Sequence, residues 1–181
     1  MKRRAILFFL LFLLQMGSVP TLAAEPTVAA QGAALIDGKT GRLLWGKNAD
    51  APLAMASTTK IMTAILVLER ASLTEVVTVS KNAAQQPKEI GARDTVFGSP
   101  NGLDSHLTAE QHHSTAYDMA LIGAYALENE TFREIIAQQE IYVSDLTGKH
   151  PCSVTNADRF LQEYSGALGI KTGYTNRAGH C

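Results

Sequence analysis

Hydrophobic residues occur along this chain in short runs separated by polar segments that favour turns. Apolar runs at residues 32–36 and 42–45 flank the segment Asp37-Gly38-Lys39-Thr40-Gly41. Two short runs around such a segment predict a β-hairpin. Further short apolar runs predict strands at residues 76–79, 140–143 and 167–170.

A longer apolar segment begins near Ser57 and runs to Leu68, with hydrophobic residues on nearly every helical face. A helix of this kind needs other elements around it and belongs in the middle of a fold. A second helix is predicted at residues 114–127, where Thr115 and Asp118 have the spacing of a capping box. Shorter helices are predicted at residues 131–138 and 157–164. Strands near both ends with helices between them predict an α/β fold with a mostly antiparallel sheet.

The segment Lys88-Glu89-Ile90-Gly91 has the pattern of the last turn of a helix followed by a glycine cap. Pro87 stands immediately before it, and a helix of four residues cannot support itself. We therefore expect that a block of helical structure is missing between residues 86 and 88.

The N-terminus has the pattern of a secretory signal peptide. Lys2, Arg3 and Arg4 precede an apolar core at residues 5–16, and small residues follow at 21–24. A membrane-spanning helix needs about 20 apolar residues, more than this core contains. We expect residues 1–23 to be removed and residues 24–181 to work outside the cytoplasm, in the cell envelope, the periplasm or on the outer face of the membrane. An uncleaved anchor is the alternative.

Composition narrows the class of protein further. The 181 residues are 46% hydrophobic and 18% charged, which excludes a disordered tail, a collagen-like fibre and a coiled coil. Sixteen basic and seventeen acidic residues leave no basic excess for binding nucleic acid. Two cysteines, Cys152 and Cys181, do not make a disulfide framework, and we expect them to stay unpaired.

Candidate chemistry begins with Ser57-Thr58-Thr59-Lys60, at the start of the apolar helix. Residues three apart lie on one helical face, so the Ser57 hydroxyl and the Lys60 amine can meet. Burial and the helix dipole both lower the pKa of such an amine, and a neutral amine can act as the base for a serine nucleophile. The alternative is that Ser57 or Thr58 is an ordinary N-cap, although the third position is then expected to be Glu or Gln rather than Lys.

A second candidate is Lys171-Thr172-Gly173, at the end of the predicted strand 167–170. Lysine and threonine there would face a bound ligand, and glycine would allow the ligand to approach the backbone closely. The same triplet at residues 39–41 lies inside the predicted hairpin turn, where we interpret it as turn chemistry. His106, His112 and His113 have no metal-ligand spacing and are interpreted as loop histidines.

In this order, Ser-x-x-Lys and Lys-Thr-Gly resemble the signature of the penicillin-recognising serine enzymes, which also contains Ser-x-Asn. Residues 56–64, 100–103, 114–120 and 169–175 look like D-alanyl-D-alanine carboxypeptidases, the low-molecular-mass penicillin-binding proteins that trim peptidoglycan stem peptides. The resemblance covers nearly all of residues 32–181. It implies a β-lactamase/transpeptidase-like α/β fold, with Ser57 as nucleophile and Lys60 as base.

The chain departs from the family at the Ser-x-Asn motif, which belongs in a helical subdomain after the nucleophile helix. Ser80-Lys81-Asn82 and Ser99-Pro100-Asn101 match the pattern, but neither is in the family's position. We therefore expect an internal deletion that removes most of this helical subdomain. The sequence also stops at Cys181, where the family continues with further strands and a helix, so we expect a C-terminal truncation as well.

By resemblance, Lys60 takes the proton of Ser57, whose oxygen attacks the carbonyl between two terminal D-alanines. The N–H groups of Ser57 and Tyr174 would form the oxyanion hole. Substrate binding would fall to Lys171, Thr172 and Gly173. Water then hydrolyses the acyl-enzyme, a β-lactam would acylate Ser57 instead, and neither a metal nor an organic cofactor is required.

Two other functions stay open from the sequence. A serine β-lactamase shares the signature, although nothing here looks like its deacylating glutamate and residues 169–175 favour the carboxypeptidase. A non-catalytic remnant is the second alternative, because the Ser-x-Asn motif normally helps to pass a proton to the leaving nitrogen.

Overall fold

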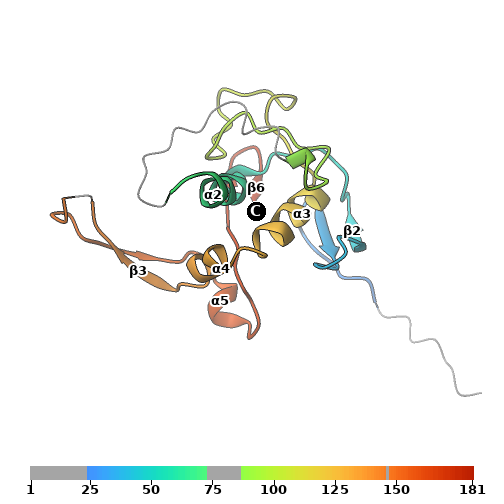
Figure 1. Cartoon of the computed structure of the whole chain (residues 1–181). Helices are drawn as coiled ribbons and strands as arrows, with labels where there is room; N and C mark the ends of the chain where they lie inside the picture. The colour runs from blue at the N-terminus through green and yellow to red at the C-terminus, as the bar shows by residue number, and fades with distance from the viewer. Residues whose placement is uncertain (1–23, 73–86, 146) are drawn as a thin grey trace, which may run out of the picture.

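A computed structural model describes residues 24–72, 87–145 and 147–181. Two helices, α2 and α3, lie near the centre of the molecule, and a two-stranded hairpin projects from its side (Figure 1). Every strand pair in the described residues is antiparallel, and the pairs form three separate two-stranded sheets. The elements are β1 (Ala33–Ile36), β2 (Leu43–Lys47), the 3-10 helix η1 (Ala56–Thr59), α2 (Lys60–Arg70), α3 (Ala116–Ala126), α4 (Glu130–Ile136), β3 (Glu140–Val143), β4 (Cys152–Thr155), α5 (Phe160–Glu163), β5 (Tyr174–Thr175) and β6 (Gly179–His180).

The predicted N-terminal hairpin is confirmed as β1 and β2. Its turn is held by Asp37, whose Oδ1 accepts hydrogen bonds from the Thr40 N–H at 2.8 Å and the Thr40 hydroxyl at 2.7 Å. These bonds favour the ionised carboxylate and lower the pKa of Asp37. Gly41 has a φ of +69°, which favours glycine. The triplet at residues 39–41 therefore has a turn role, as predicted.

The hydrophobic core lies where α2 packs against α3 and α4. Ile61, Met62 and Ile65 of α2 are buried there. The other members of the buried cluster are Ala92, Ile122, Ala126 and Phe132. The predicted central position of the helix is therefore confirmed on this face.

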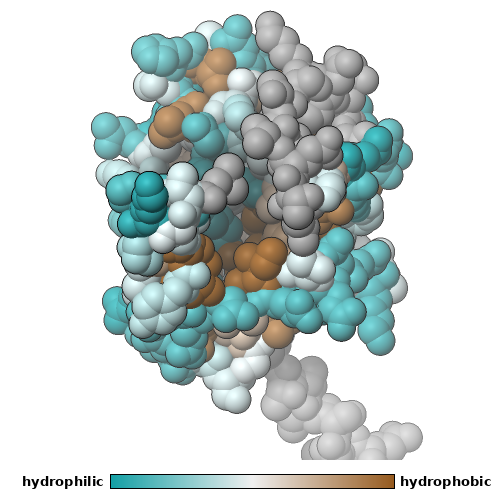
Figure 2. All heavy atoms as spheres, turned by 60° about the vertical axis from the view of Figure 1, so that its left-hand side comes forward, coloured by the Kyte–Doolittle hydropathy of each residue, from teal (hydrophilic) through white to brown (hydrophobic). Residues whose placement is uncertain are grey.

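Part of the apolar surface of α2 is less well covered by the residues that the structure describes. Leu66 and Leu68 are only half-buried. A cavity of about 160 Å³ lies between α2 and the turn that contains Ile90, with Tyr125 of α3 on its wall. Figure 2 shows hydrophobic surface gathered around a hollow on one face of the molecule. The described residues thus leave a cavity beside α2, and Met62 and Ile65 of the core also line it.

The capping box predicted for α3 is half formed. The Thr115 hydroxyl accepts a hydrogen bond from the Asp118 N–H at 3.0 Å, so Thr115 is the N-cap. The Asp118 carboxylate does not complete the box; its Oδ2 accepts from the Asp94 N–H and the Thr95 hydroxyl, both at 2.8 Å. Asp118 therefore anchors the preceding loop to α3.

Residues 87–92 have the backbone hydrogen bonds of a helix end, as their sequence predicts. The Ala92 N–H donates to the Pro87 carbonyl at 2.9 Å, and the Gly91 N–H donates to the Lys88 carbonyl at 3.3 Å. Gly91 has a φ of +88°. This pair of bonds around a left-handed glycine is the Schellman motif, which ends α-helices.

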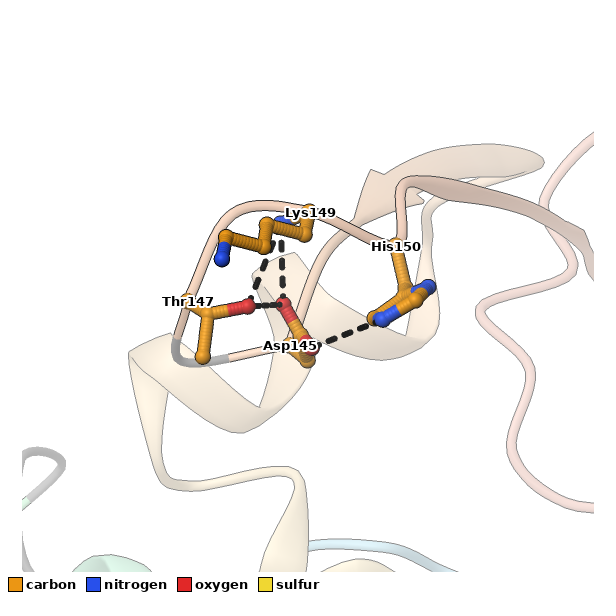
Figure 3. A network of polar contacts seen from close by, with 4 residues as sticks. All are labelled: Asp145, Thr147, Lys149 and His150. Atoms are coloured by element: carbon orange, nitrogen blue, oxygen red, sulfur yellow. Dashed lines mark hydrogen bonds and ion pairs between the residues drawn. The ribbon is translucent and has the colours of Figure 1, made fainter.

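The projecting hairpin consists of β3 and β4, and its loop is organised by Asp145 (Figure 3). One oxygen of this carboxylate accepts from the Thr147 hydroxyl at 2.8 Å and from the Lys149 N–H at 3.1 Å. The other oxygen lies 3.8 Å from Nε2 of His150. These hydrogen bonds lower the pKa of Asp145, the one from Thr147 most strongly. The loop is thus ordered by its own polar contacts, whereas every residue of the two strands β3 and β4 is exposed.

Two predicted elements differ in the structure. Residues 167–170 form no strand; Ile170 packs against the core and Gly169 lies close to Ile136 of α4, while Leu168 is exposed. The helix predicted at 157–164 shortens to α5 because the Asn156 and Asp158 side chains accept backbone N–H bonds before it.

The strand predicted at residues 76–79 and the signal peptide predicted at residues 1–23 lie outside the described residues. Within the described ranges, no helix has the length and hydrophobicity needed to cross a membrane. Cys152 and Cys181 are free thiols, as expected.

Candidate active site

Ser57 and Lys60 meet where η1 continues into α2. The Lys60 amine donates a hydrogen bond to the Ser57 hydroxyl, with 3.0 Å between Nζ and Oγ. Residues three apart share one side of a helix, so local helical geometry is enough to bring these groups together. The alternative, that Ser57 or Thr58 is an ordinary N-cap, is wrong, because the cap residues are Met55 for η1 and Thr59 for α2, and neither makes a side-chain cap hydrogen bond.

The surroundings of Lys60 lower the pKa of its amine from the ordinary value of 10.5. Partial burial of the amine is the larger cause, even though much of the side chain is exposed, and the positive charge of Lys171 is the second. Both disfavour the charged form. A larger share of Lys60 is therefore neutral at moderate pH and able to accept a proton from Ser57.

Lys60 has a second partner that sequence reasoning missed. Its amine donates to the backbone carbonyl of Asn101 at 2.6 Å, and the Thr63 hydroxyl donates to the carbonyl of Pro100, also at 2.6 Å. The Asn101 side chain is occupied by its own turn, where its Oδ1 accepts from the Ser99 hydroxyl and the Leu103 N–H. The Pro-Asn-Gly turn signal was visible in the sequence, but backbone carbonyls carry no sequence signature.

The backbone before Ser57 is held in an unusual conformation. Ala56 is fully buried and has a φ of +46°, which is uncommon for a residue with a side chain. Gly102 presses against it so closely that a methyl group on Gly102 would lie 1.8 Å from the Ala56 oxygen. The loop that contains Asn101 and Gly102 thus supports both the turn that leads into Ser57 and Lys60.

The triplet Lys171-Thr172-Gly173 also reaches this turn. A methyl group on Gly173 would lie 2.8 Å from the Ser57 nitrogen, closer than real side chains approach. Lys171 is exposed, donates to the Thr172 carbonyl, and lies near enough to Lys60 to affect its pKa. Tyr174 begins β5 and is 58% exposed. The sequence-predicted residues are therefore gathered around Ser57 from two distant parts of the chain.

Two further contacts attach the strand after this triplet to the supporting loop. The Thr175 hydroxyl donates to Oδ2 of Asp104 at 3.0 Å, and the Arg177 guanidinium donates to the Leu107 carbonyl at 2.7 Å. Gly173 and Cys181 also exchange two backbone hydrogen bonds of 2.9 Å. The residues beyond Gly173 therefore hold the triplet in place.

The sequence also offered a Ser-x-Asn triplet at residues 80–82 and three histidines as candidates. Ser80-Lys81-Asn82 lies outside the described residues. His106, His112 and His113 lie outside the helices and the named strands, in keeping with their interpretation as loop histidines. His106 is exposed, whereas His112 is completely buried, which the sequence did not indicate. In the described ranges, no three His, Cys, Asp or Glu residues cluster so as to hold a metal ion.

Comparison with known proteins links this geometry to a family. The profile of the peptidase S11 family, described as D-alanyl-D-alanine carboxypeptidase, matches residues 19–93 and 84–181. The D-alanyl-D-alanine carboxypeptidase DacF of Bacillus subtilis is 29% identical over 209 aligned positions, which cover 84% of this chain and 52% of DacF. This chain thus spans about half the length of that relative.

The alignment with DacF also bears on the internal deletion. Because 84% of 181 residues is about 152, about 57 of the 209 aligned positions have no residue in this chain. The two family matches overlap at residues 84–93, a stretch that contains the turn at residues 87–92. These observations support a missing internal block at the place where the sequence predicted it.

Solved structures share the fold. A D-alanyl-D-alanine carboxypeptidase from Mycobacterium tuberculosis H37Rv matches with a TM-score of 0.71 and 25% identity, over 91% of this chain and 78% of that one. The Streptomyces K15 DD-transpeptidase matches with a TM-score of 0.70 and 22% identity, over 87% and 85% of the two chains. The predicted β-lactamase/transpeptidase-like α/β fold is therefore confirmed. Since the family profile covers nearly the whole sequence, this chain belongs to the D-alanyl-D-alanine carboxypeptidase family.

Proposed function

We propose that this chain is a serine-type D-alanyl-D-alanine carboxypeptidase whose nucleophile is Ser57 and whose base is Lys60. The observation that carries the proposal is the 3.0 Å contact between the Lys60 amine and the Ser57 hydroxyl, with Gly173 packed against the Ser57 backbone. Family membership supplies the substrate class, a peptidoglycan stem peptide that ends in D-Ala-D-Ala, with β-lactams as covalent inhibitors.

The contacts of Lys60 suit the role of a base. Charged Lys60 donates to both the Ser57 hydroxyl and the Asn101 carbonyl. Once it is neutral, the amine has two N–H groups and one lone pair; one N–H stays on the Asn101 carbonyl, and the Ser57 hydroxyl then donates to the lone pair across the same 3.0 Å contact. The Ser57 oxygen then forms a bond with the carbonyl carbon between the two D-alanines. Breakage of the carbon–nitrogen bond releases D-alanine, which takes the proton from Lys60. Water hydrolyses the acyl-enzyme and restores Ser57.

The remaining roles follow from position. The N–H groups of Ser57 and Tyr174 act as the oxyanion hole, where one donor is typically worth a factor of about 10²–10³ in rate. Lys171 and Thr172 hold the terminal carboxylate of the substrate, and Gly173 leaves room for it. The positive charge that lowers the pKa of Lys60 is the same charge that would attract this carboxylate.

We also propose that residues 1–23 direct export and that residues 24–181 form the working domain in the cell envelope. Peptidoglycan lies outside the cytoplasm, so this location matches the substrate. The charged start and short apolar core of the sequence support the proposal.

Labelling with a fluorescent penicillin tests the nucleophile. The purified chain should be labelled slowly, the Ser57→Ala variant should not be labelled, and Ser153→Ala, which changes a serine of the outlying strand β4, should behave as the wild type. Labelling that persists in Ser57→Ala would show that another residue is the nucleophile.

Release of D-alanine from a D-Ala-D-Ala peptide separates the candidate functions. Without a Ser-x-Asn motif in the family's position, proton transfer to the leaving nitrogen loses help that is typically worth about 10²–10⁴ in rate. We expect peptide cleavage slower than in an intact relative by at least this factor. If the chain is folded but is neither labelled by penicillin nor able to cleave the peptide, the non-catalytic remnant is favoured. Rapid hydrolysis of nitrocefin would favour a β-lactamase.

A further inference from the structure

His112 is a buried histidine that joins the two segments on which the candidate site is built. Its side chain is fully buried, and its Nε2 lies 3.4 Å from the Thr59 hydroxyl of η1. On the other side of the ring, Nδ1 accepts a hydrogen bond of 3.2 Å from the Gly98 N–H. Gly98 begins the loop that continues to Asn101, the partner of Lys60.

The hydrogen-bond partners select one neutral form of this ring. The Gly98 N–H can only donate, so Nδ1 must carry a lone pair, and the single ring proton must be on Nε2. The Thr59 hydroxyl donates to the Ala56 carbonyl at 2.9 Å, which leaves its oxygen free to accept from Nε2. Every donor in this chain of hydrogen bonds therefore has an acceptor, and protonation of Nδ1 would set two donors against each other.

The chain of hydrogen bonds ends at the residue before Ser57. The Ala56 carbonyl receives the Thr59 hydroxyl, and Ala56 holds the left-handed conformation that turns the backbone into Ser57. The backbone next to His112 is held in place, because Val96 and His113 exchange two backbone hydrogen bonds of 2.9 and 3.1 Å. A change at His112 is therefore transmitted to the nucleophile turn and to the loop behind Lys60.

We propose that His112 is a positioning residue whose neutral form ties the turn carrying Ser57 to the loop holding Lys60, so that Ser57 is acylated efficiently only while His112 is neutral. The effect on acylation rests on the proposed function. The link between His112 and the two segments stands on the geometry alone.

The charged groups around His112 come from three segments. Burial lowers the pKa of His112 from its ordinary value of 6.5; Asp104 of the supporting loop opposes this shift, while Arg177 beyond β5 and the neighbouring His113 add to it. The facing group on η1 is Thr59, which does not titrate in this range. The pKa of His112 in the folded state lies below its ordinary value. The stability that the neutral ring contributes is therefore fully present above about pH 6.5 and is lost as the pH falls through the folded-state pKa.

Three variants test the proposal with fluorescent penicillin. His112→Gln keeps an amide acceptor and an amide donor but cannot titrate, and His112→Leu removes both hydrogen bonds. His106→Gln, at an exposed loop histidine, is the matched control. The acylation rate is measured from pH 4.5 to 8, with thermal melting by circular dichroism at each pH to restrict the comparison to folded protein.

In the wild type and in His106→Gln, the logarithm of the rate should fall by about one per pH unit while only Lys60 binds a proton, and by about two below the pKa of His112. In His112→Gln the slope should stay near one. His112→Leu, if folded, should be acylated roughly 10–100-fold more slowly at every pH. Identical slopes in the wild type and His112→Gln would overturn the proposal.

Nuclear magnetic resonance gives a readout that needs no activity. In the wild type, ¹⁵N imidazole signals should show the Nε2–H form, and the backbone amide signals of Ser57 and Thr59 should shift as His112 titrates. These shifts should vanish in His112→Gln. An Nδ1–H form, or a Ser57 signal indifferent to His112, would overturn the proposal even if the enzyme is active. A wild type that is not acylated but shows the coupled shifts would refute the proposed function and leave the link intact.

Discussion

The backbone of Gly173 lies against the backbone of Ser57 so closely that a Cβ at residue 173 would stand 2.8 Å from the Ser57 nitrogen and 3.4 Å from its Cα. The neighbouring contact is also tight, since the same Cβ would lie 3.1 Å from Cβ of Ala56. The obstacles are backbone atoms of Ser57 and the short side chain of buried Ala56 rather than the end of a flexible side chain. Glycine at this position therefore sets how near the Lys-Thr-Gly segment comes to the candidate nucleophile.

Replacing this glycine should separate the two halves of the site. In Gly173→Ala, the segment must move away from Ser57, and a displacement of about 1 Å typically costs a factor of about 10² in rate. We expect labelling by fluorescent penicillin to slow by roughly this factor. Gly38→Ala is the matched control, because nothing lies within 4 Å of a Cβ at residue 38. Equal labelling of the two variants would contradict the close approach.

The effect of Lys171 on Lys60 predicts a shift in pH dependence. Lys171→Gln removes a nearby positive charge, so the charged form of Lys60 is less disfavoured and its pKa rises. Since the proposed mechanism needs neutral Lys60, the rising limb of the acylation rate should move to higher pH. Lys39→Gln, in the other Lys-Thr-Gly triplet, should leave the limb where it is. A limb that stays in place in Lys171→Gln would show that the two amines do not interact.

Burial predicts different costs for two isoleucines. Ile65 of α2 is 1% exposed, and truncation of such a buried residue to alanine typically lowers the free energy of unfolding by about 2–5 kcal/mol. Ile135 of α4 is 54% exposed, so Ile135→Ala should cost less than about 1 kcal/mol. Urea unfolding of both variants measures the difference. Similar losses at the two positions would mean that α2 does not form the core.

The proposed signal peptide predicts where the exported protein begins. Cleavage after the small residues at 21–24 leaves an N-terminus at Ala24 or Glu25. Edman sequencing of protein recovered from the cell envelope should read one of these starts. Detection of Met1 on that material would support the uncleaved anchor instead.

The pairing of Ser57 with Lys60 was predictable because it depends on local geometry. A spacing of three residues within a helix places two side chains on the same side, whatever surrounds them. The β1–β2 hairpin and the glycine-capped turn at residues 87–92 were predictable for the same reason, since Asp37, Gly41 and Gly91 act on backbone groups a few residues away. The prediction of a strand at residues 167–170 was wrong, because an apolar run can belong to a strand or to a loop that packs on the core, and Ile170 packs on the core.

The rest of the site is the product of tertiary structure. The Asn101 carbonyl reaches Lys60 across 41 residues of sequence, and the His112 ring reaches Thr59 across 53. Neither contact has a sequence pattern, because a backbone carbonyl is present in every residue and a histidine in a loop is usually exposed. Sequence by itself determined that Ser57 and Lys60 are candidates for the chemistry, through their types and their spacing within one helical turn. Only the tertiary structure decided which groups contact these residues, because burial and close approach depend on how segments distant in the sequence pack together.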